Sequence, residues 1–184
     1  MSDAATVPGR RARALVITAS DKAARGERAD ASGDAVAGRL RAMGFEVERR
    51  VVPDERPEIE HALVEGARAH DLVVTTGGTG LTPRDVTPQA TAAVLDYEVP
   101  GLAEAMRAEG RRHTPMASLS RGLAGVLGRT LVVNLPGSPN GATESFDAIA
   151  PVIPHALETI AGPFDHAAWG TGADAVANER GSRG

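Results

Sequence analysis

An α/β fold, a three-layer α/β/α sandwich with helices on both faces of a mostly parallel sheet, is predicted by three features. Short apolar runs alternate along the chain with longer segments of helical periodicity. The run Arg13 to Ala19 is continuously apolar, as expected for a strand that is covered on both faces. The length of 184 residues suits a single domain.

The first half of the chain supplies three predicted strands, at residues 13–19, 45–52 and 71–76. A polar loop from residue 20 to about 31 follows the first strand. Asp30 or Ser32 can then cap a helix that ends at Gly44. The next helix begins at Pro57, and its apolar residues share one face: Ile59, Ala62, Leu63, Gly66 and Ala67.

The second half is predicted to begin with a helix that Thr87 caps and that extends to about Asp96. Another helix follows Gly101. Two strand-like segments lie within residues 118–136, around Gly125 and Gly128, and predict a hairpin whose second strand is 130–135. Helices from about 141 to 161 close the domain, so the predicted domain covers residues 13–162.

The two ends are predicted to be tails. Residues 1–12 carry arginines without the apolar segment of a signal peptide, which indicates a flexible N-terminal tail. Residues 163–184 are rich in Gly, Ala, Asp and Asn and predict a disordered C-terminal tail, although Phe164 and Trp169 could hold its start.

Composition argues against several functions. The chain has no cysteine, which excludes disulfides and thiolate metal sites and fits a cytoplasmic location. No apolar run approaches the roughly 18 residues of a membrane span, so no membrane association is expected. A net charge of −4 argues against nucleic acid as a partner. Lys22 is the only lysine, so a Schiff base or a P-loop is not expected.

The segment "TTGGTG" directly follows a predicted strand and indicates a phosphate site. Ligands of parallel α/β proteins bind beyond the carboxyl ends of strands. Glycines let a ligand approach the main chain, and successive amides can form an anion-binding nest. The candidate residues are Thr75, Thr76, Gly77, Gly78, Thr79 and Gly80. The same letters also suit a tight turn that binds nothing, and the loop alone does not separate the two interpretations.

Asp85 lies a few residues beyond this loop, where a carboxylate would repel a phosphate unless a cation lay between them. Mg²⁺ held by one or two carboxylates and by phosphate oxygens would resolve the repulsion. Asp54 follows the second strand and can face the same crevice. Each aspartate on its own also suits an ordinary turn or helix start. Further polar residues follow the first and last strands: Ser20, Asp21, Asn134, Gly137 and Ser138.

The histidines show no metal-ligand spacing and are interpreted as surface residues: His61, His70, His113, His155 and His166. Ser120 in "LSRG" could be a nucleophile in principle, but no base is adjacent in the sequence, so a structural hydroxyl is preferred.

The motifs "TTGGTGLTPRDVTPQAT", "LSRG" and "NLPGSP", in this order, resemble the MoaB/Mog family of molybdenum cofactor biosynthesis, to which the gephyrin N-terminal domain is related. "ASDKAARGERADASG" also fits the first loop of that family. The resemblance covers about residues 13–162. It implies an α/β homotrimer that adenylylates molybdopterin with MgATP, releases pyrophosphate and passes its product to a molybdenum insertion protein.

By this resemblance, Asp54 and Asp85 would be the catalytic residues and would hold Mg²⁺ directly or through water. The residues implied to bind substrate are Ser20, Asp21, Thr75 to Gly80, Ser120, Asn134, Pro136, Gly137 and Ser138. Gly110 stands where a relative has serine, a departure that concerns one pterin contact. Two alternatives remain open: a non-catalytic molybdopterin-binding or assembly protein of the same family, and a nucleotide hydrolase of the competence/damage-inducible type.

Overall fold

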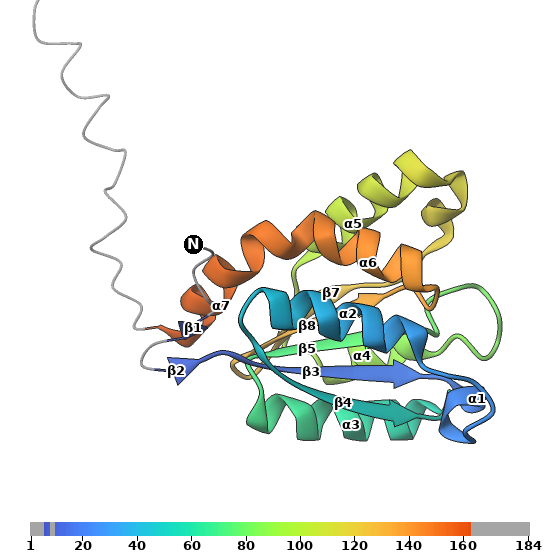
Figure 1. Cartoon of the computed structure of the whole chain (residues 1–184), viewed down its shortest axis with the longest axis horizontal. Helices are drawn as coiled ribbons and strands as arrows, with labels where there is room; N and C mark the ends of the chain where they lie inside the picture. The colour runs from blue at the N-terminus through green and yellow to red at the C-terminus, as the bar shows by residue number, and fades with distance from the viewer. Residues whose placement is uncertain (1–5, 8–9, 163–184) are drawn as a thin grey trace, which may run out of the picture.

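The computed structural model describes residues 6–7 and 10–162. Its main sheet has six strands in the order β4-β3-β5-β8-β7-β6 (Figure 1). The strands are β3 Arg13–Ala19, β4 Glu46–Val52, β5 Leu72–Thr76, β6 Tyr97–Glu98, β7 Ala124–Leu127 and β8 Thr130–Leu135. The first four in spatial order are parallel, whereas β7 is antiparallel to both β8 and β6. The predicted mostly parallel sheet and the predicted hairpin are confirmed.

The register brings the carboxyl ends of four strands to one edge. Thr76, the last residue of β5, pairs with Thr18 of β3 on one side and with Leu135, the last residue of β8, on the other. Ala19 at the end of β3 pairs with Val52 at the end of β4. The loops that follow these strands therefore lie side by side, which is what a shared site requires.

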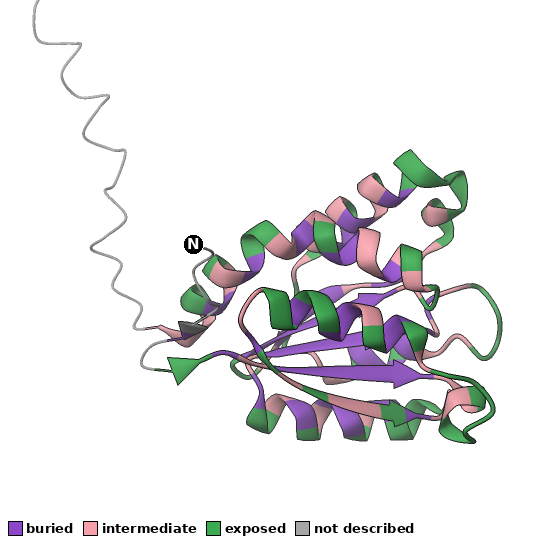
Figure 2. Cartoon of the chain, viewed as in Figure 1, coloured by how far each residue is buried: buried purple, intermediate pink, exposed green. Residues whose placement is uncertain are grey.

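Helices cover both faces of the sheet, which gives three layers (Figure 1). One face carries α2 Ala31–Ala42, α5 Pro100–His113, α6 Pro139–Ile149 and α7 Ile153–Ala161; the other carries α3 Arg56–Ala69 and α4 Thr87–Val94. Alternate strand residues enter the two layers, so that Val16 lies in the same core cluster as Leu40 of α2, while Leu15 and Ile17 lie in the cluster of Ile59 of α3. The inner strands β3, β5, β7 and β8 are buried along most of their length, whereas the edge strands β4 and β6 are mostly half-buried or exposed (Figure 2).

Several short elements differ from the sequence prediction. Part of the expected first loop forms a short helix, α1 Asp21–Ala24, and two single-turn 3₁₀ helices lie at η1 Pro115–Leu119 and η2 Ala150–Val152. The edge strand β6 was not predicted, because two residues carry no periodic pattern.

The predicted cap at Thr87 is wrong, since Val86 occupies that position and Thr87 is the first helical residue. Its amide donates to Gly78 O at 3.2 Å, which draws Thr87 into the helix. The buried hydroxyl of Thr87 has no hydrogen-bond partner among the residues that the structure describes.

Within the predicted N-terminal tail, β1 Thr6–Val7 and β2 Arg10–Arg11 form an antiparallel pair. The pair is anchored to the domain, because Arg10 makes a two-bond contact with the carboxylate of Asp71 at 2.7 and 2.8 Å and Val7 is buried. The described part of this segment therefore packs on the domain. The predicted C-terminal tail, with Phe164, His166 and Trp169, lies outside the described residues. Among the helices described, none has the length and apolar character that a membrane crossing demands.

Candidate functional site

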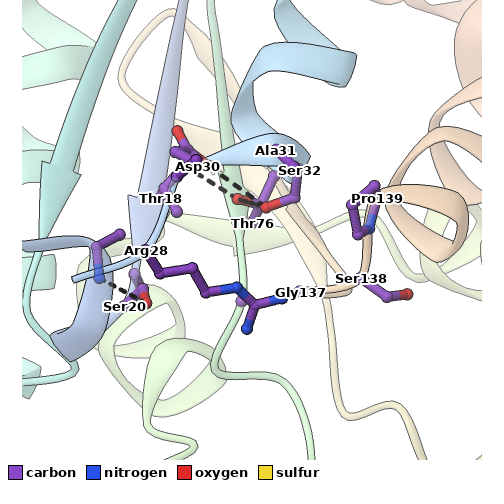
Figure 3. Close-up of a pocket in the computed structure, with 14 residues that line it drawn as sticks. Thr18, Ser20, Arg28, Asp30, Ala31, Ser32, Thr76, Gly137, Ser138 and Pro139 are labelled. Atoms are coloured by element: carbon purple, nitrogen blue, oxygen red, sulfur yellow. Dashed lines mark hydrogen bonds between the residues drawn. The ribbon is translucent and has the colours of Figure 1, made fainter. Parts of the chain in front are cut away.

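A pocket of about 350 Å³ opens at the carboxyl edge, between the ends of β3, β5 and β8 and the start of α2 (Figure 3). Five of the predicted substrate-binding residues line it: Ser20, Thr76, Gly77, Gly137 and Ser138. Ser20 and Ser138 also cap α1 and α6, accepting from the amides of Ala23 and Gly141. The structure thus brings together residues that are far apart in the sequence.

A line of buried hydroxyls along this pocket ends at a carboxylate. Ser32 Oγ lies 3.2 Å from Thr76 Oγ1, Thr76 donates to Thr18 Oγ1 at 3.1 Å, and Thr18 donates to Asp30 Oδ2 at 2.8 Å. Thr76 gives its single hydroxyl proton to Thr18, and the Ser32 hydroxyl lies between two possible acceptors, Thr76 Oγ1 and, at 3.5 Å, Asp30 Oδ1. The carboxylate, which only accepts, therefore fixes the direction of the Thr18 and Thr76 protons.

Asp30 is held by two further groups. Its Oδ1 accepts from the Gly33 amide at 2.8 Å and caps α2, and its Oδ2 accepts from Arg49 Nη2 at 2.6 Å. Its side chain is only 8% exposed. Burial acts to raise the pKa of Asp30, but the hydrogen bonds from Arg49, Gly33 and Thr18 hold that pKa below its ordinary value. The pocket wall is therefore charged, paired and rigid.

Arg28 is the cation of the pocket and is not among the residues predicted from the sequence. Its side chain extends across the opening toward Gly137 (Figure 3). Within the described part of the chain, its guanidinium has no hydrogen bond or ion pair. A free guanidinium facing a glycine-bearing loop suits a phosphate. In the sequence, the only indication of this role was the position of Arg28 in a polar loop that follows a strand, as the two glycine motifs also do.

The glycine loop differs from a simple row of free amides. The Gly77 amide donates to Leu135 O at 3.2 Å and so prolongs the ladder between β5 and β8. Gly77 has φ 93°, and a Cβ there would lie 2.5 Å from Ala19 O, so only glycine fits. A Cβ on Gly137 would lie 3.1 Å from Gly77 Cα, which shows how closely the two loops approach. The Gly77 amide is therefore occupied by Leu135 and does not belong to a nest of free amides.

The Asp85 carboxylate turns back onto its own loop. Its Oδ2 accepts from the Thr82 amide at 2.8 Å. Burial acts to raise the pKa of Asp85, but hydrogen bonds from Thr82 and Gly80 and the positive charge of Arg121 lower it below its ordinary value. Asp85 is therefore a fixed and ionised carboxylate.

Asp54 forms a reciprocal pair with Asp21. The Asp21 amide donates to Asp54 Oδ2 at 2.9 Å, and the Asp54 amide donates to Asp21 Oδ1 at 3.0 Å. Burial, followed by the negative charges of Asp21 and Asp85, raises the pKa of Asp54 above its ordinary value, although Arg84 opposes this. Arg84 contacts Asp21 at 2.6 Å and Glu55 at 2.8 Å, and so links the glycine loop to the loops after β3 and β4. The two predicted catalytic aspartates are thus near enough to influence each other.

Asp54 and Asp85 are compatible with Mg²⁺ that binds together with a substrate phosphate. In the described residues, no group of three or more His, Cys, Asp or Glu could hold a metal ion by itself. Mg²⁺ does not require one, because it is usually held by one or two carboxylates together with substrate phosphates and water. Among the residues described, Asp54 uses only Oδ2 for hydrogen bonding, which leaves Oδ1 for such a cation.

Three other predicted residues surround a separate, smaller cavity against α5: Ser120, Asn134 and Pro136. The Asn134 amide donates to the hydroxyls of Thr75 at 3.0 Å and Thr91 at 2.9 Å, and all three side chains are buried. The Ser120 hydroxyl accepts from the Gly122 amide at 3.3 Å, which matches the structural role preferred from the sequence.

One histidine is not a surface residue. The prediction is wrong for His70, whose side chain is 5% exposed and whose Nδ1 lies 2.9 Å from Gly66 O. It closes the end of α3, where its ring packs between that helix and β4. The described histidines His61, His113 and His155 are exposed, as predicted.

Known proteins share both the sequence and the fold. Residues 15–155 match a family model described as "Probable molybdopterin binding domain". The chain is 40% identical over 154 residues to the molybdopterin adenylyltransferase of Helicobacter pylori J99, a match covering 81% of this chain and 88% of that protein. The molybdopterin biosynthesis enzyme MoaB of Thermus thermophilus is 54% identical, with a TM-score of 0.78 over 83% of this chain and 98% of that one. The Mog protein of Mycobacterium ulcerans is 46% identical, with a TM-score of 0.77 over 81% and 99%.

Proposed function

This chain belongs to the molybdopterin-binding domain family that includes MoaB and Mog proteins, and we propose that it is a molybdopterin adenylyltransferase. It transfers AMP from MgATP to the terminal phosphate of molybdopterin and releases pyrophosphate. The relative from Helicobacter pylori bears that name. Asp54 and Asp85 are the catalytic residues, and the pocket that contains Arg28 binds an anionic part of the substrates.

One observation carries the proposal: groups of opposite charge meet at a single sheet edge. The guanidinium of Arg28, unpaired within the described residues, lies on the pocket side, and Asp54, Asp21 and Asp85 lie on the other. A reaction between two phosphate-bearing substrates needs both kinds of group, because the cation binds phosphate directly while the carboxylates bind the counterion of the other phosphate.

The chemistry needs no protein nucleophile. An oxygen of the molybdopterin phosphate attacks the α-phosphorus of ATP, a new P–O–P linkage forms, and the bond from the α-phosphorus to the bridging oxygen breaks. The leaving pyrophosphate keeps the electron pair of that bond. Since the attacking phosphate is already an anion, no general base is required, and the residues of the site act by positioning and by electrostatic stabilisation.

The carboxylates of Asp54 and Asp85 would hold Mg²⁺, directly or through water. When bound, this ion neutralises charge on the phosphates of ATP. The protein's part is to hold both carboxylates in place: the Thr82 amide fixes Asp85, and the Asp21 amide fixes Asp54.

The direct test supplies purified protein with molybdopterin, ATP and Mg²⁺ and follows pyrophosphate release together with formation of adenylylated molybdopterin. We expect release that depends on both substrates. Bound pterin without release would favour the non-catalytic binding or assembly protein instead. Hydrolysis of a dinucleotide in the absence of pterin would favour the nucleotide hydrolase.

We further propose a homotrimer that passes the adenylylated product to a molybdenum insertion protein. Exposed apolar side chains near the site, such as Leu81 at 64% and Met116 at 62%, support an assembly. Light scattering at micromolar concentration should give three times the mass of the 19.0 kDa chain, whereas a monomer would contradict the trimer.

A further inference from the structure

The segment between η1 and β7 holds the loop that carries Asp85. Arg121, the third residue of the "LSRG" motif, makes three hydrogen bonds to the main chain of that loop. Its amide donates to Thr79 O at 3.0 Å, its Nε donates to Gly80 O at 2.7 Å, and its Nη2 donates to the carbonyl of Asp85. One guanidinium therefore joins the two ends of the turn from Gly80 to Asp85.

Arg121 is itself anchored to the domain. The carbonyl of the next residue, Gly122, accepts from Arg107 of α5 at 2.9 Å. The following residue, Leu123, exchanges main-chain and side-chain bonds with Asn134 of β8 at 2.9 and 3.4 Å. The guanidinium is thus presented from the sheet and from α5, and neither anchor belongs to the glycine loop.

The turn between the two bonded carbonyls contains the contact that orients the carboxylate. Asp85 Oδ2 accepts from the Thr82 amide, and the Asp85 amide donates to Thr82 O at 3.0 Å. Both bonds lie within the six-residue turn from Gly80 to Asp85, in which residues 81–84 are exposed. Such a short exposed turn has little packing of its own, so a tie across its ends decides whether one conformation persists.

We propose that Arg121 is a positioning residue that fixes the Asp85 carboxylate for adenylyl transfer by clamping the turn from Gly80 to Asp85. The role rests on the proposed function, although the clamp itself does not. Lysine cannot replace Arg121 fully, because its ammonium is a single point charge, whereas the planar guanidinium reaches two carbonyls at once.

The test compares Arg121→Gln and Arg121→Lys with Arg41→Gln, a control on the exposed face of α2. Amide hydrogen exchange of residues 79–86 is measured on the full chain without substrates, and kcat and KM for molybdopterin are measured with MgATP. For Arg121→Gln we expect exchange at Thr82 and Asp85 to quicken by about tenfold or more, while exchange in β5 and β8 keeps its wild-type rate. We expect kcat to fall by about 100-fold with KM changed less than about threefold, because a carboxylate displaced by about 1 Å costs that much.

Arg121→Lys should fall between wild type and Arg121→Gln in both measurements, and Arg41→Gln should match wild type. Wild-type exchange in residues 79–86 of Arg121→Gln would overturn the clamp. Faster exchange with an unchanged kcat would overturn the positioning role. If Arg121→Gln does not fold, the same two criteria apply to Arg121→Lys. A wild-type protein that transfers no AMP would refute the proposed function, while the exchange data would still decide the clamp.

Discussion

The two sides of the carboxyl edge are built differently. On the pocket side, Asp30 is 8% exposed and receives bonds from Arg49, from a main-chain amide and from a line of hydroxyls. On the acidic side, Asp21 and Asp85 are partly exposed, and Arg84 reaches across from a loop that is itself exposed. Charge is balanced within the protein on the first side and left in excess on the second.

The difference shows how a protein can serve two anionic substrates at one edge. The wall is paired within itself, and Arg28 is the one cation among the described residues that line the pocket, where it faces the proposed phosphate site. The acidic side has more carboxylates than cations, so it is complete only when a ligand brings positive charge. A pocket that is already formed binds its ligand with little loss of conformational entropy. The acidic side instead needs a bound cation to neutralise its excess carboxylates.

The largest effect is expected from a substitution that disrupts the ion pair of Asp30 and Arg49 in the pocket wall. Asp30→Ala should lower the free energy of unfolding by about 3–5 kcal/mol at pH 7, because the Gly33 amide, the Thr18 hydroxyl and Arg49 Nη2 lose a buried, charged acceptor, although Asp34 still pairs with Arg49. The pKa of Asp30 is lowered in the folded state, so its contribution is complete above the unfolded pKa and is lost as pH falls through the folded pKa. Urea titrations at pH 7 and at pH 3 should therefore show a smaller deficit at the lower pH.

Asp34→Ala is the matched control, because Asp34 shares Arg49 as partner but is 64% exposed. It should cost less than about 1 kcal/mol. Equal losses for the two variants would mean that burial does not distinguish the two carboxylates.

The next largest effect is expected from removing the negative charge of Asp85 on the acidic side. Asp85→Asn should lower the rate of pyrophosphate release by about 10² to 10³, because a fixed charge at the reacting phosphates is lost. Binding of molybdopterin and the fold should be retained. Asp147→Asn should leave the rate unchanged, because Asp147 is an exposed carboxylate of α6 that pairs with Arg39 of α2. Turnover that survives in Asp85→Asn would remove Asp85 from the mechanism.

The comparison also explains which features the sequence predicts. The strands and the main helices follow from apolar runs such as Leu72–Thr76, and the common edge follows from parallel strands. The hydrogen bonding of Gly77 cannot be predicted from the sequence. No local pattern distinguishes an amide that faces a ligand from one that donates to a neighbouring strand, as the Gly77 amide does to Leu135. Arg28 and Arg121 were missed because the chain has 20 Lys and Arg residues, nearly all arginine, so an arginine carries no signal until its neighbours are known.

Arg28 gives a test of the pocket side that leaves the fold intact. Arg28→Gln should weaken binding of pyrophosphate or ATP by about 10- to 100-fold, since a hydrogen bond to a charged group contributes about 1.5–3 kcal/mol. The control is Arg25→Gln, because Arg25 lies in the same loop but pairs with Glu27 at 2.7 Å. This substitution should change ligand binding little. Calorimetry on both variants distinguishes the pocket cation from the general charge of the loop.

The smallest expected effect is a shift in pH dependence on the acidic side. Asp54 must be ionised to hold Mg²⁺, and its pKa is raised by burial and by Asp21 and Asp85, so turnover should decline as pH falls through that raised pKa. The positive charge of Arg84 opposes this rise. Arg84→Gln should therefore raise the pKa of Asp54 further and move the acid limb of kcat/KM to higher pH.

The control for that shift is Arg56→Gln, because Arg56 lies close by in the sequence but pairs with Glu60 at 2.5 Å. Its acid limb should coincide with that of wild type. An acid limb that moves to lower pH in Arg84→Gln would mean that another group than Asp54 sets it. An acid limb that stays in place would mean that Arg84 acts on Asp21 and Glu55 alone, and the acidic side would then be two independent ion pairs instead of one coupled set of charges.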